Sequence, residues 1–124
     1  MKKTTFYAEK DVGGIAKPHL FIVISEPDEN NEVLVVNAST LRNPGRADQS
    51  CVIEPGEHSA ITKRSYVAYY FAEAINAGTI KSKCNSNIFQ MAEEISDSLL
   101  VRVQEGAQKS RFLKAGLKKY FDYF

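Results

Sequence analysis

The sequence predicts one α+β domain, in which a small β-barrel or β-sheet core of five to seven strands precedes two helices. Two apolar runs, residues 20–25 and 32–38, flank a polar turn, which is typical of paired strands. After residue 85 the apolar side chains recur at helical spacing instead. We therefore expect mainly antiparallel strands over residues 1–84 and a helical segment over residues 85–124.

The N-terminal strands are separated by clear breaks. Residues 5–11 predict a short first strand, which Gly13-Gly14 ends. The run Leu20–Ser25 follows Pro18 and is short enough for a buried strand. Residues 27–31 are rich in Pro, Asp and Asn, which favour a turn, and residues 32–38 then predict the partner strand.

The middle of the chain predicts three further short strands. Residues 42–46 are a loop by composition. Residues 51–54 and 58–63 flank a Pro-Gly turn and predict a strand on each side of it. Residues 65–71 combine aromatic and β-branched side chains, which favour another strand. Residues 72–83 are ambiguous, with a turn at Gly78 and room for a short strand after it.

The C-terminal third predicts two amphipathic helices. Ser86 has the side chain of a helix N-cap, and the first helix should end near Glu105-Gly106. A second helix should begin near Ser110. The apolar residues expected on the buried faces are Ile88, Met91, Ala92, Ile95, Leu99 and Val103 in the first, and Leu113, Leu117, Tyr120 and Phe121 in the second.

Composition bounds the function less tightly than the fold. A content of 44% hydrophobic and 25% charged residues is ordinary for a globular protein, and the net charge of +1 argues neither for nor against nucleic acid. The two cysteines form no metal motif or disulfide framework, so we expect no metal and no cofactor. The start lacks a signal-peptide run and no stretch is long and apolar enough to span a membrane, so we expect a cytoplasmic protein.

The densest set of reactive side chains lies in residues 48–69. His58 follows the Pro-Gly turn, where its side chain is expected to reach solvent and handle a proton near neutral pH. Lys63 and Arg64 follow closely as cations. A general base beside cations suits metal-independent cleavage of RNA, because the base deprotonates the 2′-hydroxyl and the cations offset phosphate charge. The alternative is a structural histidine that bonds a turn carbonyl.

Other residues extend this candidate site. His19 is a second histidine that either serves the site or packs at a strand edge, and Cys51 with His58 allows a cysteine nucleophile or, more simply, a buried thiol. Arginine forks suit phosphate, and tyrosine faces suit unpaired bases, although tyrosines here also suit a core. The residues expected to contact substrate are His19, Ser39, Thr40, Arg42, Arg46, Ser65, Tyr66 and Tyr69, with Tyr70 as a further stacking surface.

Three stretches in this order resemble one known family. They are Pro18-His-Leu-Phe-Ile-Val-Ile-Ser25, Val33-Leu-Val-Val-Asn-Ala-Ser-Thr40 and His58-Ser-Ala-Ile-Thr-Lys-Arg-Ser-Tyr-Val67. The chain is similar in these segments to the MazF/PemK-like toxins of bacterial type II toxin–antitoxin systems. The resemblance covers roughly residues 13–80.

The resemblance implies an SH3-like barrel that forms a homodimer, metal-independent endoribonuclease activity on single-stranded RNA, and a cognate antitoxin protein as partner. It implies that Ser39 and Thr40 match a hydroxyl pair lining the RNA groove, and that Lys63 or Arg64 lies near the catalytic arginine. The usual Arg-Pro before the first long strand is here Lys17-Pro18-His19. A different class of function, a non-catalytic SH3-like binding module for a protein partner, stays open.

Overall fold

A computed structural model describes residues 1–124, apart from the side chain of Val12. Seven strands form one sheet in the order β4-β5-β3-β2-β1-β7, with β6 also paired to β3, and every pairing is antiparallel. This confirms the predicted α+β class, although the sheet does not close on itself. The strands are β1 (Thr5–Val12), β2 (Ile15–Val23), β3 (Glu32–Thr40), β4 (Val52–Ile53), β5 (Ser65–Val67), β6 (Glu73–Asn76) and β7 (Gln90–Ala92). The helical elements are η1 (Tyr69–Phe71), α1 (Ala77–Asn85), α2 (Asp97–Lys109) and η2 (Ala115–Tyr123), of which η1 and η2 are 3₁₀ helices.

The hairpin β1–β2 has a two-residue turn made of Gly13 and Gly14. Their φ angles are 62° and 82°, a left-handed conformation that glycine adopts without strain. A two-residue turn with both φ angles positive matches the right-handed twist of the strands that it joins. The turn thereby sets the register, in which Lys10 pairs with Lys17 and Ala8 with His19.

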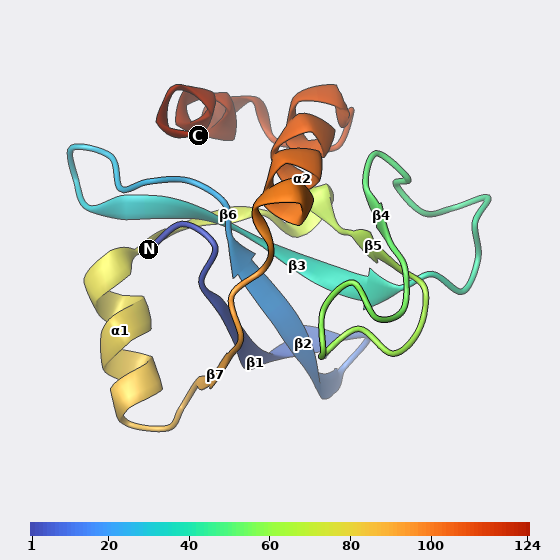
Figure 1. Ribbon diagram of the computed structural model, residues 1–124, viewed down its shortest axis with the longest axis horizontal. Coiled ribbons are helices and arrows are strands. Elements are labelled where there is room, and N and C mark those ends of the chain that lie inside the picture. The colour runs from blue at the N-terminus through green and yellow to red at the C-terminus, as the bar shows by residue number, and fades with distance from the viewer.

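Both faces of the sheet are buried, which explains the continuous apolar runs in β2 and β3. Ile22, Ile24, Leu34 and Val36 face a core shared with α2 and η2, whereas their sequence neighbours, such as Val23, face a second core against α1. Successive side chains of a strand point to opposite faces, so a strand covered on both sides must be apolar throughout. Figure 1 shows α2 and the C-terminal segment above β3, and α1 below β3 at the left of the view.

Side-chain caps fix where the two α-helices begin. The Asn76 side chain accepts hydrogen bonds from the backbone N–H groups of Gly78 and Thr79, and the Ser96 hydroxyl accepts one from Leu99. In α2 the buried residues recur at helical spacing and pack into the main core. No helix in the described part of the chain is long and apolar enough to cross a lipid bilayer.

Several expected elements differ in the structure. Residues 58–63 form no strand. β4 covers only Val52–Ile53, and Arg102 of α2 binds Glu57 in the loop that follows it. The helix expected from Ser86 is replaced by the end of α1, a turn with Asn87 at φ 62°, and β7. Strand β7 pairs with the edge of β1, so pairing between distant segments outweighs the local helical spacing. Helix α2 also runs past Gly106 to Lys109.

The C-terminal segment is fixed to the β2–β3 turn. The Tyr120 hydroxyl is buried and donates to the Asp28 carboxylate over 2.9 Å. Asp28 also accepts from the backbone N–H groups of Asn30 and Glu32. Side chains of residues 110–124 therefore pack into the same core as the strands.

Candidate functional site

One groove gathers most of the residues expected to contact substrate. Its volume is about 400 Å³. His19, Ser39, Thr40, Arg42, Ser65 and Tyr66 line it, together with Tyr7, Lys10, Lys17, Pro18, Leu20, Ala38, Ala60, Ile61 and Phe71. The groove thus contains three cations and one histidine, and no carboxylate among the side chains that the structure describes. Its charge and its aromatic rings suit an anionic ligand.

The cations of the groove come from the β1–β2 hairpin and from the end of β3. Lys10 and Lys17 are directly opposite each other in the antiparallel register, so their side chains project from the same face of the hairpin. Arg42 follows the end of β3 by two residues. Like charges on directly opposed residues repel each other and destabilise a sheet. An anion bound between the two side chains would offset this repulsion.

Lys10 is the most enclosed of these cations. Its Nζ lies 3.3 Å from Asn37 Oδ1 and 3.4 Å from the centroid of the Phe71 ring. Asn37 is fully buried, and its Nδ2 donates to the Ser39 hydroxyl over 3.3 Å. Partial burial lowers the pKa of Lys10, and the charge of Glu73 opposes that shift. A chain of polar contacts thus runs from the ammonium to a hydroxyl of the groove.

His19 lines the groove, and one of its ring nitrogens bonds the backbone. Its Nδ1 lies 3.1 Å from the carbonyl oxygen of Lys17. A carbonyl only accepts, so this contact places the proton on Nδ1 and leaves Nε2 of the neutral ring as an acceptor. The side chain is half-buried. This geometry equips His19 to take a proton from a ligand hydroxyl.

Hydroxyl and aromatic groups complete the groove. Ser39 pairs with Tyr66 and Thr40 with Ser65 in the β3–β5 register, so two adjacent strands carry all four side chains. The Ser65 hydroxyl donates to the Lys63 carbonyl oxygen over 2.8 Å. Tyr66 is half-buried and lines the groove with its ring.

The prediction that the His58 side chain reaches solvent is wrong. His58 is 3% exposed and does not line the groove. Its Nδ1 lies 3.0 Å from the backbone nitrogen of Ala60, and its Nε2 lies 2.7 Å from the carbonyl oxygen of Glu93. The neutral ring with its proton on Nε2 satisfies both bonds, so no ring nitrogen is left for a ligand. His58 fastens the loop after β4 to the segment before α2.

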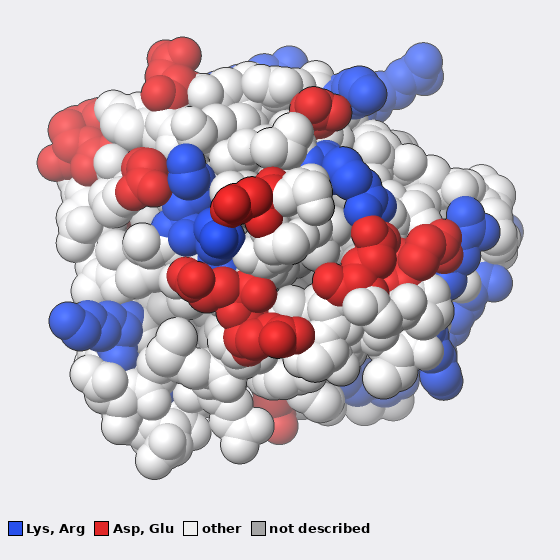
Figure 2. Space-filling view, in the orientation of Figure 1, with Lys and Arg blue, Asp and Glu red and all other residues white. Residues whose placement is uncertain are grey.

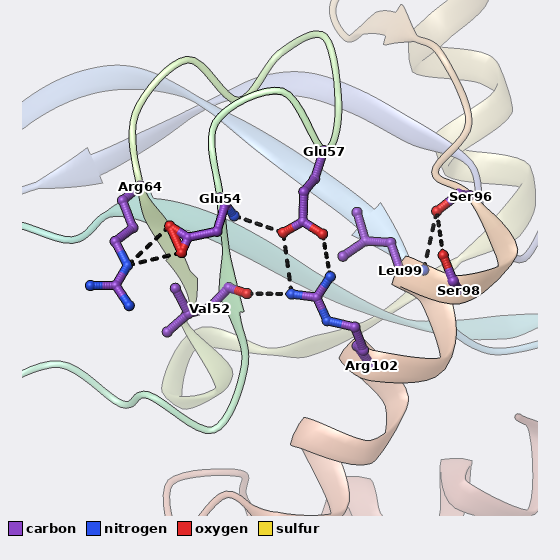
Figure 3. A network of polar contacts seen from close by, with 8 residues as sticks. All are labelled: Val52, Glu54, Glu57, Arg64, Ser96, Ser98, Leu99 and Arg102. Carbon is purple, nitrogen blue, oxygen red and sulfur yellow. Dashed lines mark hydrogen bonds and ion pairs between the residues drawn. The ribbon is translucent and has the colours of Figure 1, made fainter.

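Lys63 and Arg64 lie on the surface outside the groove lining. Arg64 Nε lies 3.1 Å from Glu54 Oε1 in an exposed ion pair. Figure 3 shows this pair beside a second one, in which Arg102 of α2 holds Glu57 and the Val52 carbonyl. A catalytic role for Lys63 or Arg64 stays a prediction, and it would require a site other than the groove.

Tyr69 and Cys51 are core residues. The Tyr69 ring is fully buried, and its hydroxyl donates to the Val103 carbonyl oxygen over 2.6 Å, so the prediction that it contacts substrate is wrong. Burial also raises the pKa of the Cys51 thiol, which disfavours the thiolate that a nucleophile requires. Arg46 lies outside the groove but lines a neighbouring pocket with Tyr66.

The surface charge is divided between regions of the molecule. Figure 2 shows acidic side chains gathered over the middle of one face, with Lys and Arg along the edge where β3 ends. Several of the acidic residues are already paired, as Glu57 is with Arg102 and Asp97 is with Lys3. No group of three His, Cys, Asp or Glu side chains suited to a metal ion occurs within the described structure.

Sequence reasoning missed several residues of the groove, among them Lys10, Lys17, Tyr7 and Phe71. The signal for Lys10 was present in the sequence. A two-residue Gly13-Gly14 turn makes residues 10 and 17 partners, and Lys17 precedes the Pro18-His19 pair already singled out. Phe71 had no such signal, because its position depends on the 3₁₀ turn after β5.

Comparisons with known proteins found no match to the chain. No protein-family model matches the chain, and no characterised protein or solved structure matches it significantly. The assignment of function therefore depends on the groove itself.

Proposed function

We propose that the chain binds single-stranded RNA in the groove and cleaves it without a metal ion. The observation that carries this proposal is the lining of the groove, where Lys10, Lys17 and Arg42 stand beside His19 and no carboxylate occurs among the described side chains. Cations supply affinity for phosphate, and the rings of Tyr7 and Tyr66 supply surfaces for unpaired bases.

In the proposed reaction His19 Nε2 removes the proton from a ribose 2′-hydroxyl. The 2′-oxygen forms a bond to phosphorus, the bond from phosphorus to the 5′-oxygen breaks, and that oxygen takes a proton from solvent. The products are a 2′,3′-cyclic phosphate and a 5′-hydroxyl. Lys17 and Arg42 offset the negative charge that builds on the phosphate, and Ser39 and Thr40 orient it.

We further propose that the bent, open sheet is a variant of the SH3-like barrel, and that the protein is a toxin restrained by an antitoxin and active as a homodimer. Support comes from the resemblance of residues 13–80 to MazF/PemK-like toxins and from the two hydroxyls, Ser39 and Thr40, in the groove. In such a system the partner is a small antitoxin protein encoded beside the toxin.

Induced expression in bacteria tests the toxin proposal. Growth should stop with the wild-type chain and continue with Lys17→Ala/Arg42→Ala, which removes two groove cations. A matched double variant, Lys81→Ala/Lys118→Ala, removes two exposed cations elsewhere and should still stop growth. Normal growth with the wild-type chain, at a level of soluble protein equal to that of the variants, would contradict the toxin proposal.

The alternative function is a non-catalytic module that binds a protein partner and does not act on RNA. The burial of His58 favours it, because only one of the two histidines of the chain then lies in the groove. Intact RNA after long incubation, together with a tight complex between the chain and a protein, would support this alternative.

A further inference from the structure

Three aromatic side chains next to the groove are unusually exposed. Tyr70, Phe71 and Phe112 are 57%, 52% and 52% exposed, although large apolar rings generally seek burial. They line a pocket of about 260 Å³, which we call the aromatic pocket. Its other lining residues are Arg46, Asp48, Tyr66 and Ala68. An exposed cluster of this kind marks a binding site more often than scattered apolar residues do.

The aromatic pocket continues from the groove. Tyr66 and Phe71 line both of them, so the two cavities are adjacent and a ligand chain can reach from one to the other. The Phe71 ring already bears the Lys10 ammonium, which belongs to the groove. Phe112 comes from the segment between α2 and η2, so the C-terminal part of the chain completes the pocket.

The two cavities differ in charge. The groove has cations only, whereas the aromatic pocket has one carboxylate, Asp48, and one guanidinium, Arg46. Asp48 is held in place, because its Oδ1 accepts from the Ser50 hydroxyl over 2.6 Å and its Oδ2 accepts from the Ser110 hydroxyl over 2.6 Å. A fixed carboxylate repels phosphate but accepts N–H groups, and a guanidinium donates to carbonyl oxygens. A nucleobase edge offers both kinds of group.

We propose that the aromatic pocket is a nucleobase subsite, which holds one unpaired base of the RNA strand whose phosphate lies in the groove. This inference rests on the proposed function and adds where the base goes. Stacking on Phe112 supplies affinity, and Tyr70 and Phe71, whose rings lie at 88° to each other, flank the base. Asp48 and Arg46 contact the base edge. Continuity with the cationic groove and the mixed charge of the pocket favour a nucleobase over an apolar side chain of a protein partner.

Binding of a fluorescent 2′-O-methyl RNA hexamer tests the subsite, because this probe cannot be cleaved through the 2′-oxygen. A second hexamer carries abasic residues and keeps only sugars and phosphates. Phe112→Ala should weaken binding of the base-bearing hexamer roughly tenfold and leave the abasic hexamer unaffected, as expected for the loss of one stacking partner. Ile88→Ala, which truncates another exposed apolar residue, is the matched control and should change neither.

The outcomes separate the subsite from the function. If the wild-type chain binds both hexamers equally and Phe112→Ala changes neither, the subsite is overturned and the RNA groove stands. Equal weakening of both hexamers by Phe112→Ala also overturns it, as does a protein complex that needs Phe112 while RNA binding does not. If the wild-type chain binds neither hexamer, the proposed function falls and the subsite falls with it.

Discussion

The ammonium nitrogen of Lys10 lies 3.4 Å from the centroid of the Phe71 ring, and both side chains line the groove. A cation over an aromatic face is attracted to the electron density of the ring, more so where water is excluded. Partial burial also lowers the pKa of Lys10, because the charged form loses hydration. The groove therefore holds a partly dehydrated cation, which gains more from a bound anion than a fully hydrated one does.

The lowered pKa of Lys10 predicts how RNA binding responds to alkali. As pH rises toward 10.5, the ordinary value, Lys10 should lose its charge earlier than a lysine with that ordinary pKa, and affinity for the 2′-O-methyl hexamer should fall. Lys10→Arg keeps its charge throughout this range, so its affinity should fall later. The measurement is the dissociation constant from pH 7 to pH 10.5 at fixed salt. Superimposable profiles would show that Lys10 does not contact the anion.

The groove cations predict the salt dependence of binding. Lys17→Ala and Arg42→Ala should each lower affinity for the hexamer and reduce the slope of log affinity against log salt by about 1, because each removes one phosphate contact. Lys81→Ala removes an exposed lysine of α1 and should leave the slope unchanged. Equal slopes for all three variants and the wild type would mean that the phosphates bind elsewhere.

The buried His58 predicts a loss of stability and no direct role in binding. His58→Ala removes the bonds to the Ala60 backbone nitrogen and the Glu93 carbonyl, so it should lower the free energy of unfolding by about 1–3 kcal/mol. His19→Ala changes a half-buried residue with one local bond, so stability should change by no more than about 0.5 kcal/mol. Urea unfolding measures both. A His58→Ala protein of wild-type stability would contradict the structural role.

The buried Asp28 predicts instability in acid. The backbone N–H of Glu32 is the main cause that lowers the pKa of Asp28 below its ordinary value of 3.8, and the Tyr120 hydroxyl adds to it. A carboxylate with a lowered pKa stabilises the fold above the unfolded value, and this contribution is lost as pH falls through the folded value. Thermal midpoints between pH 7 and pH 2 should therefore fall less for Asp28→Asn than for the wild type. Parallel curves would assign acid unfolding to other groups.

The local signals predicted β1 to β5 at least in part, and six of the fifteen residues that line the groove. Apolar runs located β2 and β3, and Gly13-Gly14 marked a break in the chain, which the structure shows to be the turn of the β1–β2 hairpin. Because β3 and β5 are neighbours, hydroxyls and tyrosine that are distant in sequence, such as Ser39 and Tyr66, meet in the groove as expected.

Residue type alone did not predict which reactive side chains are buried. His58 and Tyr69 have polar atoms that suit a site, yet each bonds a carbonyl from a distant segment, namely Glu93 and Val103. Those partners lie 35 and 34 residues away in sequence, so no local pattern reports them. The same reason explains β7, which depends on the free edge of β1 and not on its own propensity.

The most direct test of the central claim is cleavage of a short single-stranded RNA by the purified protein in EDTA. The proposal predicts fragments with 2′,3′-cyclic phosphate ends from the wild type and from Arg64→Ala, and a rate at least roughly 100-fold lower for His19→Ala, since general base catalysis contributes about that much. Intact RNA with the wild type, or equal cleavage by wild type and His19→Ala, would contradict the proposed role of the groove.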